Sequence, residues 1–135
     1  ADLRDISQYA IVSNYAYKTM KRLLPGPYTF ILPASRLVPK ILMTKRQTTG
    51  IRVPANEICL SLVRELGHPI ISTSASTDKD EILSDPEEIR KRYGYAVELI
   101  LDGGILASEK SSVISLVDDV PEVIRAGKGD VSEFQ

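Results

Sequence analysis

Hydroxyl and guanidinium side chains stand where several short apolar segments of this 135-residue chain begin or end. They are Thr48, Arg52, Ser72, Ser74, Ser111 and Arg125. A hydroxyl donates a hydrogen bond to a phosphate or carboxylate oxygen, and a guanidinium binds such anions through parallel donors. Ligands of open α/β sheets bind beyond the strand ends. The pattern therefore predicts an anion site that positions reactants and neutralises charge, without a general acid or base.

The sequence offers little for metal or nucleophilic chemistry. One cysteine and one histidine disfavour a zinc site built from this chain alone. Cys59 lies on an apolar helical stripe and is expected in the core, and His68 has no second histidine to act with. The run Gly127-Lys128-Gly129 lacks the upstream glycine and the following Ser or Thr of a phosphate loop. We therefore expect no catalytic side chain and no metal held by protein ligands.

Charge is unevenly distributed along the chain. Residues 1–69 hold ten Lys/Arg and four Asp/Glu, whereas residues 70–135 hold seven and fourteen. A basic half indicates a surface for a polyanion such as RNA, whose affinity would fall steeply with salt. The candidate RNA-binding residues are Lys18, Lys21, Arg22, Lys45 and Arg46. The alternative is a solvated face, and on a helix the first three also complement the C-terminal end of the dipole.

Caps and periodicity place the elements of the first half. Ser13 is the expected N-cap of a helix that must stop at Pro25-Gly26-Pro27. Residues 28–32 and 48–53 are predicted strands, separated by an exposed loop over residues 33–47. Asn56 is the expected N-cap of the next helix, whose apolar stripe should face the core and which ends at Gly67.

The second half continues the alternation of strands and helices. Residues 69–73 and 97–101 are predicted strands, and a helix begins at Asp85. Residues 112–117 and 122–125 are predicted as an antiparallel pair, and the tail after Gly129 as loose. The fold class is α/β (α+β), a twisted open mixed β-sheet flanked by helices in one domain over residues 1–135. No apolar run reaches the roughly 18 residues of a membrane span, so no membrane partner is expected.

Six segments carry a resemblance to a known family. They are PGPYTFIL (25–32), TTGIRVP (48–54), PIISTSAS (69–76), LDGG (101–104), SSVI (111–114) and VIRAG (123–127). In this order they resemble the YrdC/YciO family over essentially the whole chain. The first two segments are the more specific ones, and the serine-rich ones are less so. The resemblance implies a twisted open α/β sheet around a deep, positively charged cavity.

The resemblance also implies an activity and its ligands. Members of the family make threonylcarbamoyl-AMP from threonine, bicarbonate and ATP for the t6A modification of tRNA, with release of pyrophosphate. The residues implied for ATP are Thr48, Ser74 and Arg125, and those implied for threonine are Arg52, Ser72 and Ser111. Mg²⁺ would accompany ATP, held mainly by phosphate oxygens. The alternative within the family is a non-catalytic protein that binds tRNA or double-stranded RNA; a cytoplasmic location is expected for either.

Two departures from the family pattern shape these expectations. The family's S-x-N triplet is Ser74-Ala75-Ser76 here, and Ser115 stands where an aspartate is usual, which is closer to the YciO branch. The family's N-terminal third, with its K-x-R motif, has no counterpart, so the chain matches the C-terminal two thirds of the family domain. We therefore expect little synthase activity from this chain alone. We also expect exposed sheet edges that favour a homo-oligomer.

Overall fold

The computed structural model describes residues 3–42, 45–107 and 109–135, which form two compact units. Residues 1–70 and 111–135 make up the first unit, and residues 71–110 the second. The elements of the first unit are α1 (Leu3–Tyr9), α2 (Asn14–Leu23), β1 (Tyr28–Pro33), β2 (Thr48–Arg52), α3 (Glu57–Leu66), β3 (Ser112–Ser115) and β4 (Glu122–Arg125), with 3₁₀ turns at Lys40–Leu42 and Ser132–Phe134. The second unit holds α4 (Pro86–Tyr93). Within the described ranges, every helix is too short or too polar to span a bilayer.

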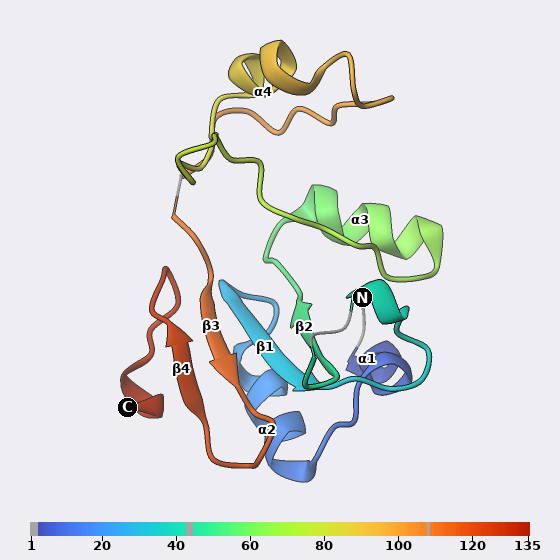
Figure 1. The fold of residues 1–135 in the computed structure, drawn as a ribbon, viewed down its shortest axis with the longest axis vertical. Coiled ribbons are helices and arrows are strands. Elements are labelled where there is room, and N and C mark those ends of the chain that lie inside the picture. The colour runs from blue at the N-terminus through green and yellow to red at the C-terminus, as the bar shows by residue number, and fades with distance from the viewer. Residues whose placement is uncertain (1–2, 43–44, 108) are drawn as a thin grey trace. The chain divides into compact units, whose positions relative to one another are not determined.

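The strands of the first unit form one mixed sheet in the order β2-β1-β3-β4 (Figure 1). Strand β1 pairs antiparallel with β2 and parallel with β3, and β3 pairs antiparallel with β4. The central strand β1 is aromatic and β-branched, and such residues favour a pleated, half-buried strand. The sheet is open, with β2 and β4 at its edges. The predicted open mixed sheet with helices is therefore confirmed.

One face of the sheet packs against α1 and α2 and forms the core. Phe30 and Leu32 of β1 and Ile114 of β3 are fully buried. They share one apolar cluster with Ile6 of α1 and Met20 of α2. Buried and half-buried residues alternate along β1 and β3, because successive side chains of a strand point to opposite faces. The second face of the sheet is therefore the less buried one.

The predicted helix boundaries are confirmed by their caps. Ser13 Oγ accepts a hydrogen bond from the Ala16 amide at 3.1 Å at the start of α2. Asn56 Oδ1 accepts one from the Cys59 amide, also at 3.1 Å, at the start of α3. Gly67 ends α3 with φ of 75°, a left-handed conformation that glycine adopts at little cost. Local capping chemistry thus sets the ends of both helices.

The C-terminal segment is docked, so the prediction of a loose tail after Gly129 is wrong. The Tyr28 hydroxyl donates to the Asp130 carbonyl at 2.9 Å, and Phe134 is only 8% exposed. Arg22 of α2 donates two hydrogen bonds to the Glu133 carboxylate, at 2.6 and 2.9 Å. These contacts join the tail to distant segments, which the local composition of the tail does not reveal.

Helix α3 does not turn its predicted apolar stripe to the core. Ile58, Leu62 and Leu66 are 43%, 36% and 46% exposed. Leu60 is the residue of α3 that packs against the core cluster. Cys59 is exposed, so its predicted place in the core is wrong. The predicted helix is confirmed, but the period of its apolar residues does not determine which side of the helix faces the sheet.

The strands predicted at residues 69–73 and 97–101 are not formed. A strand needs a neighbour for its backbone N–H and C=O groups, and within the described ranges neither segment has one. Among the described residues of the second unit, the pairing between strand-like residues is a single bridge between Ser76 and Ile82. None of its described residues is buried, and Ile71 and Leu99 are 72% and 75% exposed. Apolar, β-branched composition is thus insufficient without a partner strand.

Replacing Phe134 by alanine should lower the free energy of unfolding by about 3 kcal/mol, because a buried aromatic side chain is lost from the core cluster. Denaturant unfolding measures this change. The control is Val120→Ala, at a side chain 74% exposed, which should change stability by less than about 0.5 kcal/mol. Equal small effects of both variants would mean that the C-terminal segment is not docked.

Stability should fall at alkaline pH because of Tyr28. Burial, followed by the nearby Asp130 and Glu133 charges, raises the pKa of the Tyr28 hydroxyl. A raised folded-state pKa gives stability that is complete below the unfolded value of about 10 and lost as pH rises through the folded value. Between pH 8 and 11, urea unfolding should therefore show a smaller decrease in the free energy of unfolding for Tyr28→Phe than for the unmodified chain.

The control for that measurement is Tyr95→Phe. Tyr95 is 89% exposed, so its removal should leave the alkaline loss of stability unchanged. Identical pH slopes for Tyr28→Phe and Tyr95→Phe would contradict the assignment of this loss to Tyr28.

Candidate functional site

Two arginines and a threonine lie in one row across the sheet. Thr29 of β1 is paired with Arg52 of β2 on one side and with Val113 of β3 on the other. Val113 is in turn paired with Arg125 of β4. Directly paired residues point to the same face of a sheet. Their sequence neighbours Phe30 and Ile114 point into the core, so this row lies on the opposite face.

A β-bulge in β4 gives Arg125 its direction. Val113 and Ile114 are consecutive in β3, but their partners in β4 are Arg125 and Val123. Val123 packs against the core, and strict alternation would send Arg125 to that same face. The extra residue, Ile124, breaks the alternation and turns Arg125 to the face of Val113. The bulge is therefore what brings the second arginine to the row.

Ser111 joins Thr29 and Arg125 by hydrogen bonds. Arg125 donates from Nε at 3.1 Å and from Nη2 at 2.9 Å to the Ser111 carbonyl. Nη2 also lies 3.4 Å from Ser111 Oγ, and that hydroxyl lies 2.8 Å from Thr29 Oγ1. Ser111 is 8% exposed. The guanidinium is thus held in place while Nη1, which makes none of these bonds, keeps its donors for another group.

Arg52 offers a full set of donors at the other end of the row. Its side chain is exposed and makes no hydrogen bond or ion pair within the part of the chain that the structure describes. Three strand spacings separate β2 from β4, which puts the Cα atoms of Arg52 and Arg125 about 14 Å apart. Both side chains are long enough to reach inward from the two edges. The row can therefore bind a ligand with two separated anionic groups, with hydroxyls between them.

The other predicted site residues stand outside this row. Thr48 is at the opposite end of β2 from Arg52, roughly 13 Å along the strand, and is 8% exposed. Ser72 and Ser74 belong to the second unit, where both are exposed residues of an irregular segment. Of the predicted set, the structure thus places Arg52, Ser111 and Arg125 on one face of the sheet, with Ser111 and Arg125 in contact.

Sequence reasoning missed Thr29. The residue lies inside the Tyr-Thr-Phe-Ile-Leu run, which is apolar on both sides of it and whose composition predicts a buried strand. The burial of β1 alternates, and Thr29 is half-buried on the second face. A polar residue between two buried aromatic ones is the pattern of a strand with one core face. That pattern could have identified Thr29.

The basic residues predicted for RNA do not form a single group of free cations. Arg22 is bound to Glu133, and Lys21 lies 5.9 Å from the centre of the Tyr17 ring. Lys18 on α2, and Lys45 and Arg46 before β2, are exposed. RNA binding therefore stays a prediction, and Arg22 is no longer a free contributor to it.

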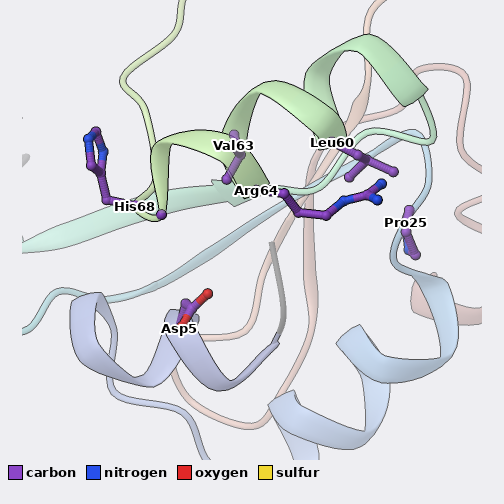
Figure 2. A pocket seen from close by; sticks show the side chains of 7 residues that line it. Asp5, Pro25, Leu60, Val63, Arg64 and His68 are labelled. Atoms are coloured by element: carbon purple, nitrogen blue, oxygen red, sulfur yellow. The ribbon is translucent and has the colours of Figure 1, made fainter.

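A pocket of about 470 Å³ lies elsewhere in the first unit (Figure 2). Its lining residues are Asp5, Pro25, Leu60, Val63, Arg64, Gly67 and His68. Figure 2 shows the Asp5 side chain of α1 directed toward α3. Arg64 is neutralised by Glu57 at 3.0 Å, and the polar lining residues are exposed. This lining contains none of the predicted site residues.

The described residues offer no preformed metal centre. Within residues 3–42, 45–107 and 109–135, no group of three or more His, Cys, Asp or Glu side chains is placed to hold an ion. The polar groups of the row are guanidiniums and hydroxyls, which suit anions better than Mg²⁺. A divalent cation at the row would therefore have to arrive with its ligand.

The chain is similar to several known proteins. The Sua5/YciO/YrdC family model, described as telomere recombination, matches residues 1–127. The chain is 46% identical to the protein YciO of Escherichia coli K12, over 98% of this chain and 66% of that protein. It is 31% identical to a threonylcarbamoyl-AMP synthase of Pyrococcus abyssi, over 85% of this chain and 34% of that protein. The chain spans about two thirds of the length of YciO.

Solved structures of relatives share the fold of this chain. The crystal structure of E. coli YciO superimposes with a TM-score of 0.94 over 99% of this chain and 66% of that chain. P. abyssi Sua5 complexed with L-threonine superimposes with a TM-score of 0.90 at 29% identity, over 98% of this chain and 40% of that chain. The family model covers nearly the whole chain, and YciO is 46% identical across it. The chain therefore belongs to the Sua5/YciO/YrdC family.

Proposed function

We propose that this chain binds ATP and threonine as the substrate-binding part of a threonylcarbamoyl-AMP synthase. The observation that carries the proposal is the row across the sheet, which places Arg52 and Arg125 on one face with the hydroxyls of Thr29 and Ser111 between them. ATP and threonine each present an anionic group, and two separated guanidiniums suit such a pair. The likeness to Sua5 complexed with L-threonine supports threonine as one ligand.

The chemistry of the proposed reaction explains why cations and hydroxyls are enough. Threonine's amine and bicarbonate form a carbamate with loss of water. A carbamate oxygen then attacks the α-phosphorus of ATP, and the bond to the β-phosphate oxygen breaks to release pyrophosphate. Negative charge increases on the phosphate oxygens and the leaving group, so guanidiniums held in position lower the barrier. Arg125 is proposed for the phosphates, and Arg52 for the carboxylate or carbamate.

Magnesium is proposed to enter with the nucleotide. Phosphate oxygens and water are its preferred ligands, and nucleotide sites commonly use few protein ligands. The residues of the row supply hydrogen bonds and positive charge to the phosphates rather than bonds to the ion. When bound, the ion would neutralise charge on the triphosphate and favour departure of pyrophosphate.

Ligand binding, rather than turnover, is the proposal for these 135 residues. The chain spans 66% of the length of YciO and 34% of that of the P. abyssi synthase. Synthesis of threonylcarbamoyl-AMP is therefore proposed for the full-length family protein, with the row as its share of the site. Ser74 stays a proposed ATP contact and Ser72 a proposed threonine contact.

Isothermal titration calorimetry should detect binding of ATP–Mg²⁺ to the chain. Threonine added to the protein sample should change the affinity of the chain for ATP–Mg²⁺. Arg125→Ala should weaken ATP binding at least tenfold, and Arg52→Ala should weaken threonine binding by a similar factor, because each removes charge-assisted hydrogen bonds. The matched control is Arg36→Ala, at another exposed arginine of the first unit, outside the row. Its affinities should stay within twofold of those of the unmodified chain.

Two results would contradict the proposed function. One is the absence of heat for both ligands in a sample that still unfolds cooperatively. The other is an equal loss of affinity in Arg36→Ala, Arg52→Ala and Arg125→Ala, because that would reflect the net charge of the chain and not a defined row.

A further inference from the structure

We propose that Thr29 is a positioning residue of the ligand site, acting through Ser111, an inference that rests on the proposed function. Its hydroxyl orients the Ser111 hydroxyl toward a ligand oxygen, and Ser111 in turn fixes the guanidinium of Arg125. The family resemblance implies no role for this threonine. The inference comes from its register between the two arginines and from its 2.8 Å hydrogen bond with Ser111.

The hydrogen bonds at Ser111 decide which proton remains available. A hydroxyl has one donor and two acceptor positions. A guanidinium can only donate, so Arg125 Nη2, at 3.4 Å, occupies one acceptor position of Ser111 Oγ. Thr29 Oγ1, at 2.8 Å, can fill the second position by donating its own proton. The Ser111 hydroxyl is then left with its proton, directed at neither neighbour.

A Ser111 hydroxyl that still has its hydrogen to donate suits an anionic ligand. Donation to a carboxylate or phosphate oxygen satisfies the hydroxyl, and a hydrogen bond to a charged acceptor is stronger than one between neutral groups. Without the Thr29 hydroxyl, Ser111 has a vacant acceptor position and a freer torsion about its Cα–Cβ bond. Thr29 therefore stabilises the rotamer in which Ser111 donates to the ligand.

The same contacts extend to the second arginine. Arg125 donates Nε and Nη2 to the Ser111 carbonyl, so the position of Ser111 sets the plane of the guanidinium and the direction of Nη1. Thr29, Ser111 and Arg125 thus form one hydrogen-bonded unit on the second face of the sheet. Loss of the Thr29 hydroxyl should affect the ligand bound by Ser111 first, and the ligand bound by Arg125 to a smaller degree.

Three variants test the inference in the 135-residue chain by titration of threonine in the presence of ATP–Mg²⁺. Thr29→Val keeps the shape of the side chain and should weaken threonine binding about five- to tenfold. Thr29→Ser restores the hydroxyl and should recover affinity to within about twofold. The control is Thr49→Val on β2. Thr49 pairs with Leu32, whose side chain lies in the core, so the Thr49 side chain is on the core face and not on the face of the row.

The outcomes separate this inference from the proposed function. If Thr29→Val binds threonine as the unmodified chain does, or if Thr29→Ser fails to restore affinity, the inference is overturned. It is also overturned if Thr49→Val weakens binding as much as Thr29→Val. If the unmodified chain binds neither ligand, the proposed function is contradicted and the inference falls with it. If binding depends on Arg52 and Arg125 but not on Thr29, only the inference fails.

A double-mutant cycle tests the route through Ser111. Ser111→Ala removes the hydroxyl to which Thr29 is bonded, so adding Thr29→Val to it should weaken threonine binding by less than a further twofold. A merely structural role of Thr29 would give the same loss in both backgrounds. Equal losses would therefore overturn the proposed route, even if Thr29→Val alone weakens binding.

Discussion

The register of β3 between β1 and β4 is the constraint on which both the fold and the site depend. Its first residue, Ser112, is fully buried, donates to the Gly129 carbonyl at 2.5 Å and accepts from the Gly127 amide at 2.9 Å. Ser111, one residue earlier, points to the opposite face and contacts Thr29 and Arg125. A slip of one residue would move each serine to the opposite face and disrupt both sets of contacts at once.

The register resists such a slip because the core face of β3 is apolar. Ile114 is fully buried against Phe30, and a one-residue shift would replace it in the core by a half-buried neighbour. Packing on one face thus fixes the polar geometry on the other. The site needs no strained backbone of its own, because the β4 bulge turns Arg125 to the row within an otherwise regular pair of strands.

The sequence predicted the parts of the fold that local chemistry controls. Ser13, Asn56 and Gly67 end their helices as expected, and the strands β1 and β2 lie where their composition placed them. The sequence predicts Arg52, Ser111 and Arg125 for the site, and the sheet places them on one face. Arg125 shares a face with Arg52 because of the bulge in β4, and strict alternation along a strand does not predict such a bulge.

The wrong predictions have one physical cause, because each concerns a contact between segments that are distant in the sequence. Residues 69–73 and 97–101 have the composition of strands, but within the described ranges no strand pairs with them. The stripe of Ile58, Leu62 and Leu66 has helical period, but Leu60 is the side chain that meets the core. The homo-oligomer stays a prediction.

The most direct test of one ligand site at the row is NMR of the chain titrated with ATP–Mg²⁺ and threonine. The side-chain Nε–Hε signals of Arg52 and Arg125, with the backbone amides of Thr29 and Ser111, report on the row. The account predicts that all four signals shift together and saturate at the concentrations that saturate the calorimetric heats. Shifts confined to Lys18, Lys21 and Lys45, with the row unchanged, would contradict it.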